Sequence, residues 1–219
     1  MSVNTSKLEH SSLSHLWNQS SETDWKRALR HYYTLLGPEA KELNEYIVNI
    51  KVTEIKNLSA PNFYSFLYDR YFVWKYTQKN RLANTRKYLK TYLTDNKLSE
   101  LADIQYRLFN AEHSDIKNCL SIASEIHGLG IPGASGLLAV LFPKDFGTVD
   151  QFVVKSLKVI DGLHYADDII KINPDYLKIK DGVILIETLK SKACDLNKKF
   201  NTDFWTPRKI DMILWSYGR

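Results

Sequence analysis

The chain is poor in cysteine, with only Cys119 and Cys194 among its 219 residues. Two thiols cannot build a disulfide framework or an all-cysteine zinc site. They also cannot hold an iron–sulfur cluster, which takes about four thiolates. We therefore expect no cluster, and we expect both cysteines to behave as small apolar side chains on the buried faces of helices.

Long apolar runs are also missing. The sequence contains no run of about 18 or more apolar residues, so we expect no membrane-spanning helix and no membrane partner. The first residues are polar and rich in serine, without the apolar core of a secretion signal. We interpret residues 1–20 as a polar leader, and we expect a protein of the cytoplasm.

Two common catalytic signatures are absent as well. The six histidines never recur at the i, i+4 spacing of a zinc protease helix. No glycine-rich loop ends in a lysine followed by serine or threonine, which is the pattern that cradles nucleotide phosphates. These absences argue against a zinc protease of that type and against a P-loop nucleotide triphosphatase.

Apolar residues recur at helical spacing along most of the chain, which predicts an all-α fold. Ser21 and Asp24 form a capping-box pattern before one helix, and Thr206 followed by proline begins the last one. One stretch, 177–186, is ambiguous because an Asp-Gly pair between apolar runs also fits a β-hairpin. The apolar stripe continues for about four turns, so we favour a helix from Asp181 and keep the hairpin as the alternative.

Positive charge is concentrated in one part of the chain. The net charge is +5, yet the segment from Arg70 to Lys97 holds eight lysines and arginines against a single acid, Asp95. A local basic patch attracts phosphate backbones. The alternative is a solvated helix face that acids from elsewhere in the fold balance, and the sequence leaves both interpretations open.

The segment 126–142 combines the end of a helix, a tight turn of glycines and proline, and an apolar helix. Glycines let the backbone turn sharply and approach a ligand closely. The second helix begins with free N–H groups at the positive end of its dipole, which favours an anion. Such a hairpin can hold a DNA phosphate without reading sequence, and a plain turn between helices is the alternative.

The turn residues 131–135 (Ile-Pro-Gly-Ala-Ser) resemble the hairpin of the helix-hairpin-helix (HhH-GPD) DNA glycosylases, a family that includes the 8-oxoguanine and adenine glycosylases. In that family a helix-starting aspartate follows the hairpin, and here Val149 and Asp150 match its context. The resemblance covers roughly residues 115–160. It implies a helix-hairpin-helix glycosylase-like fold and double-stranded DNA as the partner.

By this resemblance Asp150 is the catalytic residue. Breaking an N-glycosidic bond develops positive charge on the sugar, which a carboxylate stabilises while it orients or deprotonates water. The alternative is a helix N-cap, and the two roles are compatible. Strand-cleaving members carry a lysine where this chain has Leu137, so the resemblance implies a monofunctional enzyme.

The resemblance also implies contacts for the hairpin, for the polar loop after the aromatic helix at 62–77, and for a flipped base held against an aromatic wall. The loop could equally be an exposed connection, and dense aromatic residues are typical of a core. The DNA-binding candidates are Gly130, Pro132, Gly133, Ala134, Ser135, Gly136, Gln78, Lys79 and Arg81. The candidates for the base pocket are Tyr71, Trp74 and Trp215, and the backbone carbonyls of Leu129, Ile131 and Ala134 would hold a structural Na⁺ or K⁺.

We predict a monomeric DNA repair protein that excises a damaged or modified base and associates with the nucleoid when on DNA. The spacing from Pro132 to Asp150 is shorter than the family leads us to expect, which favours the alternative of a non-catalytic helix-hairpin-helix DNA-binding protein. A third hypothesis is an interaction protein that uses the hairpin as a scaffold. The predicted layout is a leader at 1–20, an N-terminal helical part at 21–110, a helix-hairpin-helix lobe at 111–165 and C-terminal helices at 166–219.

Overall fold

The computed structural model describes residues 13–219, which are helical with no strand among them, so the all-α prediction is confirmed. Within this range no helix combines the length and apolar character that crossing a membrane requires. The helices are residues 13–19, α2 (Glu22–Thr34), α3 (Pro38–Val48), α4 (Val52–Lys56), α5 (Ala60–Phe66), the π-helix η1 (Leu67–Tyr71), α6 (Phe72–Lys75), α7 (Lys79–Thr94), α8 (Leu98–Asn110), α9 (Ile116–Ser124), α10 (Ile131–Leu141), α11 (Gln151–Leu157), α12 (Ala166–Lys171), α13 (Ile179–Phe200) and α14 (Pro207–Gly218).

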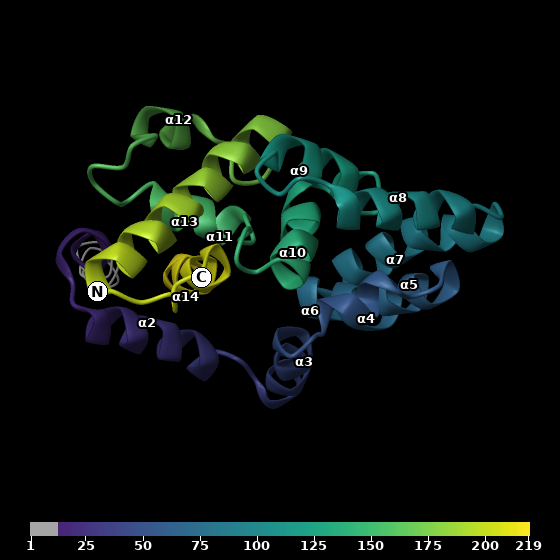
Figure 1. Ribbon diagram of the computed structural model, residues 1–219, viewed down its shortest axis with the longest axis horizontal. Helices are drawn as coiled ribbons and strands as arrows, with labels where there is room; N and C mark the ends of the chain where they lie inside the picture. The colour runs from purple at the N-terminus through teal and green to yellow at the C-terminus, as the bar shows by residue number, and fades with distance from the viewer. Residues whose placement is uncertain (1–12) are drawn as a thin grey trace.

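The helices form two groups on either side of α10 (Figure 1). One group runs from α3 to α8, and the other contains α2 and α11 to α14. Helix α10 is apolar all round and packs on α9, α13 and α14, while α2 packs on α14. The predicted N-terminal part at 21–110 is therefore divided between the two groups.

The placement of α2 follows from its apolar stripe. Trp25 is buried against Trp205, with ring centroids 5.8 Å apart, and Tyr32 is buried against Trp215 at 5.5 Å. The predicted capping box begins this helix, since Ser21 accepts a hydrogen bond from the backbone N–H at its third position. Burial of these large rings against Trp205, just ahead of α14, and against Trp215 within α14 stabilises the pairing of two helices that are far apart in the sequence.

The prediction of a leader at 1–20 is wrong for its second part. Residues 13–19 form a helix in which Leu13, Leu16 and Trp17 are buried. Their i, i+3, i+4 spacing gives one apolar face, which joins the core. Residues 1–12 lie outside the described part of the chain.

The Asp-Gly pair at 181–182 lies inside α13, so the helix prediction is confirmed and the hairpin alternative is wrong. The glycine has a packing role here. A Cβ atom on Gly182 would lie 2.9 Å from both Ile131 and Leu120, which shows how closely α13 approaches α9 and α10. The predicted cap of α14 is also present, because the Thr206 side chain accepts a hydrogen bond from the N–H of Lys209.

The two cysteines differ in their exposure to solvent. Cys119 is buried on α9 as expected, whereas Cys194 is exposed on the outer face of α13. The prediction that both are buried is therefore wrong for Cys194, because the apolar stripe of α13 passes through its neighbour Ala193 instead.

Candidate active site beside the helical hairpin

The turn between α9 and α10 packs against α7. Gly128 has a φ of +92°, and a Cβ atom there would lie 2.8 Å from the carbonyl oxygen of Thr85. The neighbouring His127 lies 2.6 Å from the hydroxyl of Thr91 and stacks on Tyr92. These contacts fix the hairpin beside the basic helix α7.

Only the tip of the hairpin is at the surface. Gly130 is exposed and Pro132 is partly exposed, and the backbone N–H groups of this first turn of α10 have no partner within the helix. The four residues that follow were also predicted to contact DNA, but they are buried, because α10 is the central helix and is covered by its neighbours from its third position onward. These buried residues are Gly133, Ala134, Ser135 and Gly136.

Ser135 has a positioning role instead of the predicted phosphate contact. Its side chain is fully buried, and its hydroxyl accepts a hydrogen bond of 3.0 Å from the N–H of Val149. The hydroxyl thereby joins α10 to the residue that precedes Asp150. Ser135 thus fixes the distance between the hairpin and the candidate catalytic residue.

Asp150 uses its two oxygens differently. Oδ1 accepts hydrogen bonds from the N–H groups of Phe152 at 3.0 Å and Val153 at 3.3 Å, so Asp150 is the N-cap of α11. Oδ2 lies 3.6 Å from the Nζ of Lys75, and the side chain remains 17% exposed. The capping interpretation is confirmed. The cap holds the carboxylate in one orientation and leaves Oδ2 outside the capping hydrogen bonds.

Lys75 is a member of this site that sequence reasoning missed. It ends α6, its side chain is only 9% exposed, and it extends along α10, where a Cβ atom on Gly136 would lie 3.2 Å from its Cδ. Burial lowers the pKa of Lys75, while the carboxylates of Asp150 and Asp211 oppose that shift. A signal was present, because Lys75 follows the buried Tyr71 by four residues and so shares its helix face.

A second ion pair, between Arg208 and Asp211 of α14, lies beside the first. Asp211 is buried and accepts a 2.6 Å hydrogen bond from the N–H of Thr148. Burial raises the pKa of Asp211 to about 7, although Arg208 opposes the shift. The guanidinium of Arg208 also lies 5.0 Å from the ring of Trp74. The site therefore contains two cations and two carboxylates.

The three aromatic candidates have different surroundings. Tyr71 is fully buried and its hydroxyl donates to the carbonyl of Gly133, so the prediction that it lines a base pocket is wrong. It belongs to the core because it anchors α10. Trp74 and Trp215 are partly exposed, the latter with its ring 6.0 Å from that of Phe152 in α11. Both tryptophans stay candidates for a wall beside Asp150.

The basic segment 70–97 separates into structural and surface residues. Arg86 donates to the carbonyl of Tyr68, and Lys97 pairs with Glu100. Gln78 is exposed at the start of α7, where the predicted loop contact lies. The α7 basic surface consists of Lys79, Arg81, Lys87 and Lys90, which are exposed and form no ion pair within residues 13–219.

The backbone carbonyls of the three predicted cation ligands are not equally available to an ion. Leu129 precedes α10, whereas Ile131 and Ala134 lie within it, where carbonyls accept helical hydrogen bonds and point along the axis. Among residues 13–219 no group of three or more histidine, cysteine or carboxylate side chains could hold a metal ion. The Na⁺ or K⁺ site stays a prediction that depends mainly on the Leu129 carbonyl.

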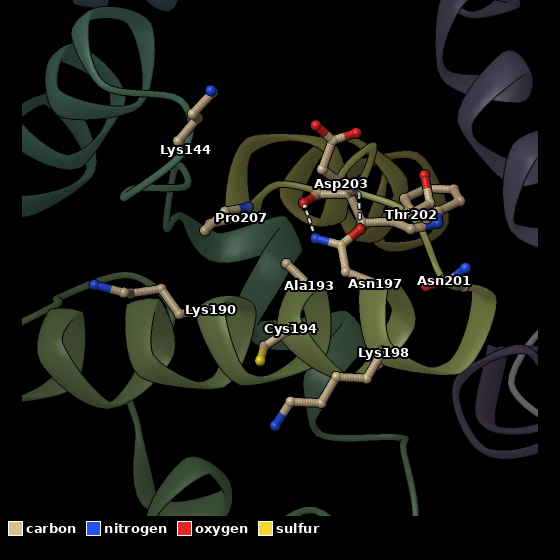
Figure 2. A pocket seen from close by; sticks show the side chains of 11 residues that line it. Lys144, Lys190, Ala193, Cys194, Asn197, Lys198, Asn201, Thr202, Asp203 and Pro207 are labelled. Carbon is tan, nitrogen blue, oxygen red and sulfur yellow. Dashed lines mark hydrogen bonds between the residues drawn. The ribbon is translucent and has the colours of Figure 1, made fainter.

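A groove of about 680 Å³ lies elsewhere, between α13 and the segment 201–207 (Figure 2). Lys144, Lys190 and Lys198 are on its rim, but none of the predicted site residues lines it. A smaller groove of about 340 Å³ lies between α3 and α4. Asp150 lines neither of these two grooves.

Comparisons of the chain with family models, with curated proteins and with solved structures find no match. The geometry around Asp150 and the hairpin is therefore what bears on function.

Proposed function

We propose that this protein excises a base from DNA by hydrolysis of the N-glycosidic bond, with Asp150 as the catalytic carboxylate. The observation that carries the proposal is the arrangement of Asp150 itself. One oxygen is fixed by the cap of α11, the other is free of the cap, and Ser135 ties the preceding residue to the hairpin helix. An aspartate with only a capping role needs none of these further contacts.

In the proposed reaction the C1′–N bond breaks and its electron pair leaves with the base. Asp150 stabilises the positive charge that develops on the sugar. Water then attacks C1′, Oδ2 of Asp150 accepts its proton, and the departed base takes up this proton, which restores the carboxylate. The bond that forms is C1′–O, so the products are a free base and an abasic sugar. The Lys75 ammonium lies 3.6 Å from Oδ2 and compensates part of the negative charge of the carboxylate.

The surface around Asp150 suits double-stranded DNA. The N–H groups at the tip of the hairpin face one phosphate, and the α7 basic surface, fixed next to it by the contacts of Gly128, offers lysine and arginine to its neighbours. The target nucleotide leaves the stack and lies against Trp74 or Trp215. With this partner we propose a monomer that acts at the nucleoid in the cytoplasm.

The alternative is a DNA-binding protein without catalysis, and two observations favour it. Lys75 compensates the charge of Asp150. In addition, Asp150 lines neither the groove beside α13 nor the groove between α3 and α4. This alternative predicts duplex binding that weakens steeply with salt, and no released base.

Base release measured by mass spectrometry distinguishes the proposed glycosylase from the DNA-binding protein without catalysis. Duplexes with uracil, 8-oxoguanine, alkylated purines or modified cytosines are incubated with the wild type, with Asp150→Asn and with Asp115→Asn. Asparagine still caps a helix, so Asp150→Asn removes charge and leaves the fold in place. Asp115 also caps a helix, α9, and forms no ion pair within residues 13–219, which makes Asp115→Asn the matched control.

We expect the wild type and Asp115→Asn to release one kind of base, and Asp150→Asn to bind the duplex without releasing it. Release at an undiminished rate by Asp150→Asn would overturn the role of Asp150. Tight, salt-dependent binding by the wild type with no release from any duplex would establish the alternative.

A further inference from the structure

The groove between α13 and the segment 201–207 has a wall that hydrogen bonds hold in place (Figure 2). Helix α13 ends at Asn201, whose left-handed backbone, with a φ of 49°, turns the chain back. Asn197 then holds the returning segment, because its side chain donates to the carbonyl of Trp205 at 2.8 Å and accepts from the N–H of Trp205 at 2.8 Å. The groove is therefore formed before any ligand binds, as most small-molecule sites are.

Trp205 lines this groove and carries a polar atom without a partner. The residue is 2% exposed, and its ring packs on Trp25 and Phe204, with centroid distances of 5.8 and 5.0 Å. Among residues 13–219 its indole Nε1 is the only buried side-chain nitrogen or oxygen atom that forms no hydrogen bond. An unsatisfied buried donor costs free energy. An acceptor supplied by a ligand would remove that cost.

Three lysines of the groove also have no structural partner. Lys144, Lys190 and Lys198 form no ion pair and donate no hydrogen bond within the described part of the chain. By contrast, Lys192 and Lys199 of the same helix α13 each donate to a backbone carbonyl. The lysines of the groove therefore have ammonium groups available for a ligand.

The charges of the groove favour an anion. Lys190 and Lys198 are eight residues apart on α13, so they lie about two turns apart on nearly the same face. Lys144 comes from the loop after α10 (Figure 2). One carboxylate, Asp203, also lines the groove, and its charge opposes the lowering of the pKa of Lys209 by burial. Three cations and a neutral donor thus stand against a single carboxylate.

We propose that this groove binds a small phosphorylated molecule, whose phosphate oxygens accept hydrogen bonds from the Trp205 indole and the three lysines. A phosphate fits these donors better than a carboxylate, because it carries up to two charges and three acceptor oxygens. The groove volume of about 680 Å³ is in the range of small-molecule sites. Because the indole is buried, its acceptor has to enter the groove, which suits a small molecule and not a wide duplex. The inference does not depend on the proposed base excision.

Nuclear magnetic resonance of the isotope-labelled protein tests the site directly, because each tryptophan indole N–H gives its own signal. Trp205→Phe identifies the signal of Trp205 by its loss. The probes are pyrophosphate, ADP as a nucleotide with the same linked phosphates, and citrate as a carboxylate of similar charge, with sodium chloride at equal ionic strength as the control. We expect millimolar pyrophosphate to shift the Trp205 signal, and sodium chloride to leave it in place.

The thiol of Cys194 gives a second readout, because it is exposed and lines the groove, whereas Cys119 is buried. Iodoacetamide should alkylate Cys194 more slowly when pyrophosphate is bound, and peptide mass spectrometry measures the rate. Cys119 is the internal control, since it stays unmodified as long as the protein remains folded.

Variants of the groove residues test the assigned contacts by calorimetry with pyrophosphate. Lys190→Gln and Lys198→Gln should each weaken binding by about two- to fivefold, which is typical of an exposed charge pair. Trp205→Phe should weaken it by about tenfold, because a hydrogen bond to a charged acceptor is lost. Lys180→Gln is the matched control, since Lys180 is exposed on the same helix outside the groove. The lysine variants test the site even if Trp205→Phe does not fold.

A Trp205 signal that pyrophosphate does not move overturns the inference, as does a shift confined to the other tryptophans. Groove variants that bind as tightly as Lys180→Gln also overturn it. Tighter binding of citrate than of pyrophosphate excludes phosphate as the recognised group. A DNA duplex that displaces pyrophosphate would assign the groove to the DNA interface instead.

The nucleotide arm identifies the source of the phosphate. Tighter binding of ADP than of pyrophosphate supports the inference with a nucleotide as the ligand, and equal affinities support it with the phosphates alone as the recognised part. None of these measurements uses base release, so failure of the proposed base excision and failure of this inference are distinguishable.

Discussion

Asp115 and Asp150 cap the helices α9 and α11 through hydrogen bonds from backbone N–H groups of the first turn. The side chain of Asp115 accepts from Asn118 at 2.9 Å and otherwise faces solvent. Asp150 makes the same kind of cap but places its second oxygen 3.6 Å from Lys75, a residue 75 positions away in the sequence. The local role is shared, and only the tertiary surroundings make one of the two a candidate catalyst.

The largest expected effect on stability appears when each capping carboxylate, Asp115 and Asp150, is removed separately. Asp115→Ala should lower the free energy of unfolding by about 1 kcal/mol, the usual cost of losing a cap. Asp150→Ala should lower it by about 3 kcal/mol, because Lys75 then stays buried without its counter-charge. Urea denaturation measures both values, and equal losses would show that the ion pair contributes nothing.

The double variant Asp150→Ala with Lys75→Met sharpens this comparison. Without the buried ammonium, the loss of Asp150 should cost about 1 kcal/mol, as at Asp115. A double variant that is no more stable than Asp150→Ala alone would mean that the lysine is not the source of the extra cost.

The next effect concerns the path of Lys75 along α10. In Gly136→Ala the added Cβ would lie 2.7 Å from the Tyr71 hydroxyl and 3.2 Å from the Cδ of Lys75, so that both side chains must move. We expect a loss of about 2 kcal/mol in unfolding free energy and slower base release. Gly37→Ala is the control, since nothing lies within 4 Å of its added Cβ. Unchanged base release by Gly136→Ala would argue against a role for the Lys75 position.

Ser135→Ala should have a smaller effect. It leaves the buried N–H of Val149 without its acceptor, which costs about 1–2 kcal/mol. Because this bond positions Asp150, we expect slower base release with unchanged duplex affinity. Ser121→Ala, which removes a bond to a carbonyl of its own helix, should leave base release as it is. A Ser135 variant that loses DNA affinity instead would restore the predicted phosphate contact.

The smallest effect is expected on the α7 basic surface. Lys79→Ala and Arg81→Ala should each reduce the slope of log affinity against log salt by about 1, since each residue neutralises about one phosphate. Lys198→Ala, on the other groove, should leave the slope unchanged. Filter binding or fluorescence anisotropy over a salt series measures the slopes, and unchanged slopes for both α7 variants would remove this surface from the DNA interface.

The sequence was sufficient for the features that depend on neighbouring residues. The caps at Ser21, Asp150 and Thr206, and the long helix α13, follow from short-range patterns and are present. The helix at 13–19 has only three buried apolar residues, Leu13, Leu16 and Trp17, within a serine-rich stretch whose composition is typical of a polar segment.

Tertiary contacts decided the rest of the candidate site. Ser135 and Tyr71 were predicted to meet DNA because their positions match a surface turn or an aromatic wall, but the helices packed on α10 bury them. Lys75 belongs to the basic segment 70–97, and charge along the sequence does not show which of its lysines turns inward. Its helical spacing from Tyr71 was the available signal.

The most direct test of the central claim compares the two capping aspartates under single-turnover conditions, on whichever duplex releases its base. We expect Asp150→Asn to slow base release by about 100-fold or more, whereas Asp115→Asn should release the base at the rate of the wild type and both variants should bind the duplex equally. Equal rates for the two variants would contradict the account, because Asp150 would then be a helix cap and nothing more.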